Sequence, residues 1–274
     1  MSEPVRLDPQ TKRALLPGAI LLLALAGSAR GQTRPLQTEE ATTAGAGRIA
    51  LEAGVVAMSH EPSFLTLRGR ERWDVPRLNL VYSPAANVEI DLEWPGRVIA
   101  VDDPDFGTVS DWGDVTLRAK LRFAGDRKGR PAIAARFAVS LPQTSHALGL
   151  GPNTNRASVQ VLLTKSLGRL AAHANLGLAI HDQVFTPHAQ HDLLAYGLAL
   201  QRSVGARFTL LGEVAGRAGK GDPVIDRTHE VRAGLRYARR RLAWDAALRR
   251  GLSAADGEWG FTAGLAWTAR APRQ

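Results

Sequence analysis

Apolar and polar residues alternate strictly along most of the chain beyond its N-terminal region. The segment 88–94 reads Val, Glu, Ile, Asp, Leu, Glu and Trp, and the segment 115–123 alternates in the same way. In the second segment the charged residues are Arg118, Lys120 and Arg122. A period of two places all charges on one face of an extended strand and all apolar groups on the other. These segments therefore predict β-strands with two different faces.

The same alternation recurs often enough to predict about twelve strands, each close to the ~9–11 residues that cross a bilayer at a tilt. The expected connections alternate in length, with short ones at 84–87, 168–169, 205–207 and 239–241 and longer ones at 59–73, 101–111, 143–156, 183–191 and 218–227. An outer-membrane barrel has an even strand number, short periplasmic turns and long external loops. The pattern therefore predicts an all-β fold, a twelve-stranded antiparallel transmembrane β-barrel of the outer-membrane type over residues 45–269.

Aromatic residues gather near the expected strand ends, where an outer-membrane barrel carries its interfacial girdles. They are Trp73, Tyr82, Trp94, Trp112, Phe123, Phe208, Tyr237, Trp244, Trp259 and Trp267. The alternative is an exported soluble β-sandwich, but that fold gives no reason for long loops to gather regularly at one end. The aromatic pattern favours the membrane barrel.

The N-terminal region resembles an export signal. Lys12 and Arg13 precede the apolar run 14–26, and small residues follow as far as Ala29. A basic start, a short apolar core and a small-residue exit predict a signal peptide over residues 1–29, with a membrane anchor or a buried helix as the alternative. Residues 30–44 are polar and small without a period, which predicts a linker, and a basic C-terminal tail is expected at 270–274.

Composition narrows the range of partners. The 274 residues include no Cys, and 35 Lys and Arg stand against 26 Asp and Glu, for a net charge of +9. The lack of Cys excludes disulfide scaffolds and thiolate metal sites. In an exported protein the positive charge does not indicate a nucleic-acid partner. We expect outer-membrane lipid and lipopolysaccharide, the barrel-assembly machinery and a small-molecule solute as partners, and the cell outer membrane as the location.

The polar face of each expected strand faces the lumen, because the charged side chains are too numerous for a dry core or a lipid-facing wall. The residues expected to line the lumen and set selectivity are Glu52, Glu89, Asp91, Glu93, Arg118, Lys120, Arg122, Arg136, His173, Glu213, Arg217, Arg232, Arg236, Asp245 and Arg249. Acidic residues of 88–94 are expected to pair with basic residues of 115–123 on the neighbouring antiparallel strand. These ladders either hold the wall together or create a field across the bore that favours a polar or anionic solute.

Four stretches resemble a known family. They are 113–120 (GDVTLRAK), 140–144 (SLPQT), 149–154 (GLGPNT) and 173–177 (HANLG). They are similar to the outer-membrane barrel family labelled for the MetA pathway of phenol degradation, over about residues 45–269. The resemblance implies a twelve-stranded envelope protein regarded as a transporter of organic compounds, with no catalytic residues to transfer. The chain differs from such barrels at its end, since a short basic tail follows Trp267.

Enzyme and metal chemistry find little support in the sequence. Outer-membrane phospholipases place a His and a Ser two residues apart on one strand, and no His-x-Ser occurs here. The segment 181–192 is rich in His and Asp, which can bind a divalent ion but is also common in exposed loops. We therefore assign no catalytic residue, no metal and no cofactor.

The sequence predicts an outer-membrane barrel that passively admits or binds a small polar or aromatic solute. A structural or interaction barrel, whose lumen is filled by its own side chains, is the alternative. An envelope lipid hydrolase is third.

Overall fold

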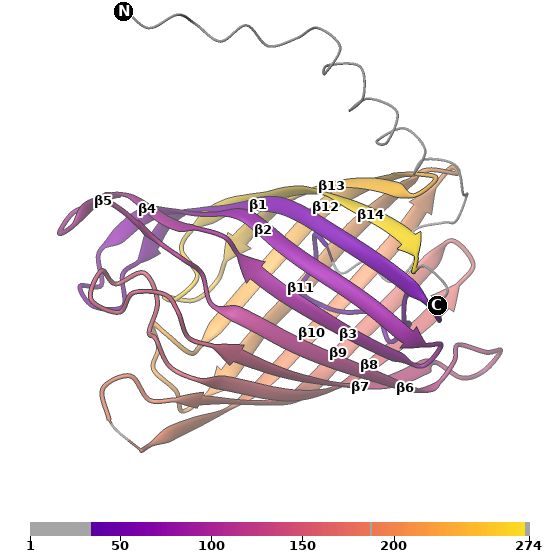
Figure 1. Ribbon diagram of the computed structural model, residues 1–274, viewed down its shortest axis with the longest axis horizontal. Coiled ribbons are helices and arrows are strands. Elements are labelled where there is room, and N and C mark those ends of the chain that lie inside the picture. The colour runs from indigo at the N-terminus through magenta and orange to yellow at the C-terminus, as the bar shows by residue number, and fades with distance from the viewer. Residues whose placement is uncertain (1–33, 187, 272–274) are drawn as a thin grey trace, which may run out of the picture.

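The computed structural model describes residues 34–186 and 188–271 (Figure 1). The expected signal peptide at 1–29 lies outside the described residues. The strands are β1 (Arg48–Pro62), β2 (Gly69–Ala85), β3 (Val88–Pro95), β4 (Val98–Asp103), β5 (Gly107–Asp111), β6 (Val115–Ala124), β7 (Ala132–Leu141), β8 (Arg156–Leu167), β9 (Leu170–Asp182), β10 (Gln190–Val204), β11 (Phe208–Gly219), β12 (Thr228–Arg239), β13 (Leu242–Gly251) and β14 (Trp259–Arg270). Among the described residues, no helix has the length and apolar character needed to cross a bilayer.

Twelve of these strands form a closed antiparallel barrel, which confirms the predicted fold. Each wall strand pairs with its neighbour, and β1 pairs with both β14 and β2, which closes the sheet. The other two strands, β4 and β5, form a hairpin that pairs with the first part of β2 through β4. This hairpin extends beyond the wall at one end of the molecule (Figure 1).

The connections differ in length at the two ends of the barrel. Turns at 86–87, 125–131, 168–169, 205–207 and 240–241 lie at one end of the barrel. Loops at 63–68, 142–155, 220–227 and 252–258, and the described residues 183–186 and 188–189, lie with the β4–β5 hairpin at the other end. In an outer-membrane barrel the short turns are periplasmic and the longer loops are extracellular. The hairpin end is therefore assigned as extracellular.

Two expected loops are shorter or more ordered than the sequence indicates. β1 and β2 continue into the expected loop 59–73, so that only residues 63–68 remain as a loop. The expected loop 101–111 contains most of the β4–β5 hairpin. Ion pairs across the two segments explain the added order, since Arg70 lies 2.8 Å from Asp103 in a buried pair. β14 also continues to Arg270, the first residue of the expected tail.

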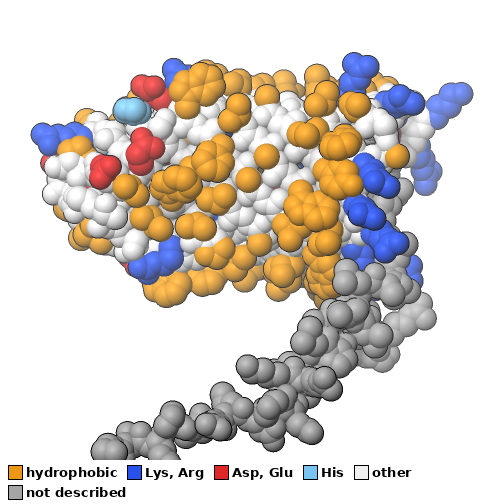
Figure 2. All heavy atoms as spheres, turned by 90° about the horizontal axis from the view of Figure 1, so that it is seen from above, with side chains coloured by type: hydrophobic (Ala, Val, Ile, Leu, Met, Phe, Trp, Pro, Cys, Tyr) orange, Lys and Arg blue, Asp and Glu red, His pale blue; other side chains and the backbone are white. Residues whose placement is uncertain are grey.

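The apolar side chains of the wall face outward, as a lipid-facing surface requires. Leu117, Phe137 and Leu248 are among the exposed large apolar residues, and Figure 2 shows such side chains spread over the outside of the barrel. Phe208, Tyr237 and Trp244 pack against one another near the periplasmic turns, with ring centroids 4.9 and 5.7 Å apart. This cluster marks the depth of one membrane interface.

The orientation is testable by cysteine labelling, because the chain has no native Cys. Cysteines placed at Asp105 or Asn153, in the long connections, are expected to react with an impermeant thiol reagent on intact cells. Cysteines at Lys128 or Arg207, in the short turns, are expected to react only after the outer membrane is opened. Equal labelling of both pairs on intact cells would refute the assigned orientation.

Candidate functional site in the barrel lumen

A segment that precedes β1 lies inside the barrel. Residues 34–44, here called the lumen segment, are mostly buried although they belong to no strand. Leu36 packs against Ala199 of β10 and Leu211 of β11, and Ala41 packs against three buried apolar residues of β7 and β8. The inner wall therefore has apolar patches that receive these two side chains.

The polar groups of the lumen segment are bound by the lumen wall. Glu213 accepts hydrogen bonds from the backbone N–H groups of Gln37 and Thr38, both at 2.8 Å at the shortest. Glu89 accepts one from the backbone N–H of Ala44 at 2.7 Å. Buried backbone donors must find acceptors, and here wall carboxylates supply them. The sequence predicts a linker over residues 30–44. Its described part, 34–44, is bound to the wall across the lumen.

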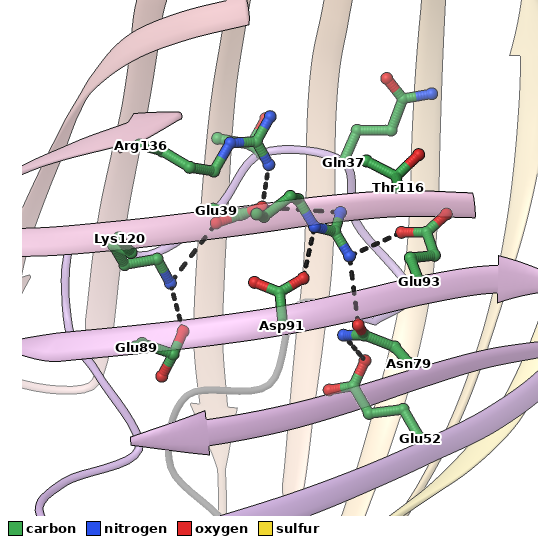
Figure 3. A network of polar contacts seen from close by, with 12 residues as sticks. Gln37, Glu39, Glu52, Asn79, Glu89, Asp91, Glu93, Thr116, Lys120 and Arg136 are labelled. Carbon is green, nitrogen blue, oxygen red and sulfur yellow. Dashed lines mark hydrogen bonds and ion pairs between the residues drawn. The ribbon is translucent and has the colours of Figure 1, made fainter. Parts of the chain in front are cut away.

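Glu39 forms the most highly charged contact between the lumen segment and the wall. Its buried carboxylate pairs with Arg136 of β7, lies 3.4 Å from Lys120 Nζ and lies 3.9 Å from Arg118 Nη1 of β6. Figure 3 shows the Glu39 carboxylate between Arg136 and Lys120. Buried charges are tolerated when they are paired in this way. Arg118 and Lys120 also pair with carboxylates of β3, whereas Glu39 is the carboxylate that pairs with Arg136 in the described chain.

The expected charge ladder between β3 and β6 is present, with a register that leaves one basic residue out. Asp91 lies opposite Arg118 and Glu89 lies opposite Lys120, and both pairs form ion contacts. Arg122 lies beyond the start of β3 and has no acidic partner there. Its Nη2 donates instead to a backbone carbonyl of the β2–β3 turn at 2.8 Å. It therefore lies at the periplasmic edge of the ladder.

The other residues expected to line the lumen lie on inner faces or contact groups there: Glu52, Glu93, Arg136, His173, Glu213, Arg217, Arg232, Arg236, Asp245 and Arg249. Several of them hold the lumen segment. Asp245 pairs with Arg34 at 3.4 Å, and Arg232 Nη1 donates to the Pro35 carbonyl at 2.7 Å. Sequence reasoning did not include Glu39 or Arg34, because their segment shows no periodicity that would place it inside a barrel.

A cavity of about 370 Å³ lies beside the lumen segment. A second cavity of about 210 Å³ shares Arg77, Arg217 and Arg249 with the first and reaches Asp256 in the β13–β14 loop. The open space thus extends from the lumen segment towards the extracellular loops. Its larger part is within the ~300–1,000 Å³ typical of small-molecule sites.

The larger cavity is lined by an excess of positive charge. Eight arginines line it, against three glutamates. Six of the arginines form ion pairs with wall or lumen-segment carboxylates: Arg34, Arg77, Arg118, Arg136, Arg232 and Arg249. Within the described residues, Arg156 of β8 and Arg217 of β11 form no ion pair with a carboxylate. These two guanidinium groups are available to an anionic solute.

Arg156 was not among the residues expected from the sequence, which assigned it to the loop 143–156. The signal was nevertheless present, because Arg156 continues the alternation of Ser158 and Gln160 on the lumen face of β8. Tyr196 lies on the other side of the wall, because it alternates with Leu194 and Leu198 on the outer face of β10. There its ring stacks on His229 and its hydroxyl lies 2.7 Å from His229 Nδ1. The cavity therefore offers two cations, Arg156 and Arg217, without a carboxylate partner among the described residues.

The β11–β12 loop is bound to the extracellular part of the lumen wall through Asp226. Its carboxylate lies 2.7 Å from His181 Nδ1 and 2.6 Å from His191 Nδ1, and it accepts the backbone N–H of Asp222 at 2.9 Å. Burial alone would raise the pKa of Asp226, but the hydrogen bonds from the two histidines lower it well below its usual 3.8. The ionised Asp226 carboxylate therefore stabilises the folded protein fully at any pH above the pKa that Asp226 has in the unfolded chain. This stabilisation is lost as the pH falls through the lower pKa that Asp226 has in the folded protein.

Three histidines of the described chain, His173, His181 and His191, are hydrogen-bonded to neighbouring side chains. His173 Nδ1 lies 2.9 Å from Thr164 Oγ1 inside the barrel, and the two histidines beside Asp226 are held by that carboxylate. No group of three or more His, Asp or Glu side chains in the described ranges is placed to hold a metal ion.

Comparison with known proteins identifies the family. Residues 32–269 match the family described as "Putative MetA-pathway of phenol degradation". The chain belongs to this family. The match covers the lumen segment as well as the twelve wall strands. A search of curated proteins finds no significant match.

Solved structures share the fold of this family member. The COG4313 outer membrane channel from Pseudomonas putida F1 is 17% identical, with a TM-score of 0.62 over 82% of this chain and 96% of the channel. The NanC porin is 10% identical, with a TM-score of 0.54 over 80% of this chain and 98% of the porin. The KdgM porin is 9% identical, with a TM-score of 0.51 over 80% and 98%. At these identities the likeness shows a shared outer-membrane barrel fold.

Proposed function

We propose that the protein is an outer-membrane channel for a small solute and that its own lumen segment closes it. The observation that carries this proposal is the placement of residues 34–44 across a barrel that also contains a cavity of about 370 Å³. A wall that needed only support would not require a cavity lined by unpaired cations. The fold shared with channels and porins supports the same function.

The solute is a small organic anion. Arg156 and Arg217 supply two positive charges that have no carboxylate partner among the described residues. Guanidinium groups bind carboxylates through paired hydrogen bonds. A small carboxylate such as benzoate fits this combination of charge and volume.

A disulfide that locks the lumen segment to the wall tests whether that segment is the gate. A Cβ atom built on Gly197 of β10 would lie 3.3 Å from Thr38 Cβ, close to the ~3.5–4.5 Å found in disulfides. We expect the T38C/G197C variant to conduct like the wild type when reduced and to stay closed when oxidised. Single-channel recording in planar bilayers, before and after addition of a reducing agent, measures the difference.

The single variants T38C and G197C are matched controls, because neither can form the bridge and the chain has no other Cys. Equal conductance of the oxidised and reduced double variant would show that the lumen segment does not gate the channel. The alternative is a structural barrel, favoured by the many ion pairs that join the lumen segment to the wall. A barrel that never conducts, even after the segment is released, would establish that alternative.

A further inference from the structure

The positive charge of the protein is concentrated at the periplasmic end of the barrel. Figure 2 shows Lys and Arg side chains gathered at the end opposite the β4–β5 hairpin, beyond the apolar band. The five periplasmic turns lie within the described residues. They contain many basic residues and one acidic residue, Asp126. That carboxylate is already paired with Lys165 Nζ at 2.8 Å. This end of the barrel therefore presents a positive surface at the level of the lipid headgroups.

An apolar groove lies on the outside of the wall next to this basic end. It has a volume of about 700 Å³ and is lined mainly by Pro131, Leu163, Lys165, Ala172, Ala174, Leu198, Leu200, Gly212 and Val214. Strand alternation explains the groove. Small residues of β9 form its floor, and larger residues of the neighbouring strands form its sides.

The register shows how the groove is built. Ala174 lies opposite Leu163 of β8 and Leu198 of β10, and Ala172 lies opposite Leu200 of β10. Leu198 and Leu200 are both more than half exposed, so their side chains stand above the alanines between the strands. The result is an apolar groove along the outer surface of β9, open to the hydrocarbon chains of lipid.

Two unpaired arginines lie at the periplasmic end of this groove. Arg202 follows Leu200 by two residues on the same face of β10 and lies opposite Leu170 of β9. Arg169 occupies the adjacent β8–β9 turn, and both side chains are exposed and form no ion pair among the described residues. Lys165 borders the groove as well, but Asp126 already holds it. Arg169 and Arg202 are therefore the free cations at the point where an acyl chain would meet its headgroup.

We propose that this groove binds an anionic phospholipid of the inner leaflet of the outer membrane. One acyl chain lies along β9 between Leu163 and the two leucines of β10, and the phosphate group lies between Arg169 and Arg202. A zwitterionic phospholipid fits the apolar groove equally well but gains less from two free cations, so net headgroup charge gives the preference. The proposal does not depend on conduction through the lumen.

Competitive lipid binding tests the site. The purified full-length protein in detergent is incubated with equal amounts of dioleoyl phosphatidylglycerol and dioleoyl phosphatidylethanolamine, and native mass spectrometry measures the lipids retained. We expect the wild type to retain phosphatidylglycerol preferentially. In the R169S/R202S variant the preference should fall by about 5-fold for each arginine removed. The A174L variant, which fills the groove, should lose retention of both lipids.

R239S/R240S is the matched control, because it removes two exposed basic residues near the β12–β13 turn, outside the groove lining. It should keep the wild-type preference. An equal loss in this control would show a diffuse basic ring in place of a site, and unchanged retention in A174L would exclude the groove. Faster migration of every unheated variant on detergent gels confirms a closed barrel and keeps these outcomes interpretable.

Discussion

Replacing Glu39 with glutamine is expected to raise the open probability of the channel by about 100-fold. The E39Q substitution keeps the size of the side chain but removes the negative charge that Arg136, Lys120 and Arg118 share. Removing one member of a buried ion network costs about 3 kcal/mol, because a buried charge is left without compensation. Here that charge is Arg136, since Arg118 keeps Asp91 and Lys120 keeps Glu89. In this barrel the three cations regain hydration when the lumen segment leaves. Single-channel recording at neutral pH measures the effect.

Glu40 supplies a control one residue further along the chain. Its carboxylate accepts hydrogen bonds from Thr42 Oγ1 at 2.8 Å and Gln201 Nε2 at 3.3 Å, and it pairs with no cation among the described residues. E40Q therefore removes the same charge from the same segment without breaking an ion pair, and its open probability should remain near that of the wild type. Similar openings in E39Q and E40Q would show that the ion network does not hold the segment closed.

The fold was predictable because each wall strand contacts lipid on one face and the lumen on the other, and its sequence reflects both environments. Lipid requires apolar side chains on one face and the lumen accepts charges on the other, so segments such as 88–94 and 115–123 alternate without interruption. The same alternation placed Glu89, Asp91 and Lys120 on the lumen side, where the structure brings them together. Local periodicity was sufficient for these positions.

The lumen segment was not predictable by the same means. Residues 34–44 form no strand, so no period marks which face they present. Their place is determined by contacts with distant residues, such as the bonds from Gln37 and Thr38 to Glu213, about 175 positions later in the chain. A polar stretch of this kind has the composition of a linker until its acceptors are known. The β4–β5 hairpin escaped prediction for a similar reason, because its buried ion pair joins Asp103 to Arg70 of β2.

Replacing Arg156 and Arg217 together with serine is expected to lower the anion preference of the open channel by about tenfold. The other arginines that line the larger cavity are paired with carboxylates, so these two provide the uncompensated charge in the described lining. A narrow passage lined by one sign of charge raises the local concentration of the opposite ion by at least that factor. The reversal potential under a salt gradient, measured during single-channel openings, reports the preference. Benzoate flux should fall in parallel, while the flux of neutral benzamide should not.

The R156K/R217K variant separates charge from geometry. It keeps both positive charges but loses the planar guanidinium groups, which bind a carboxylate through two parallel hydrogen bonds. We therefore expect a reversal potential near that of the wild type together with a reduced benzoate flux. If R156S/R217S keeps the full anion preference, the unpaired arginines do not select the solute. The preference would then arise from the paired arginines nearer the lumen segment, and the organic-anion proposal would fail at this site.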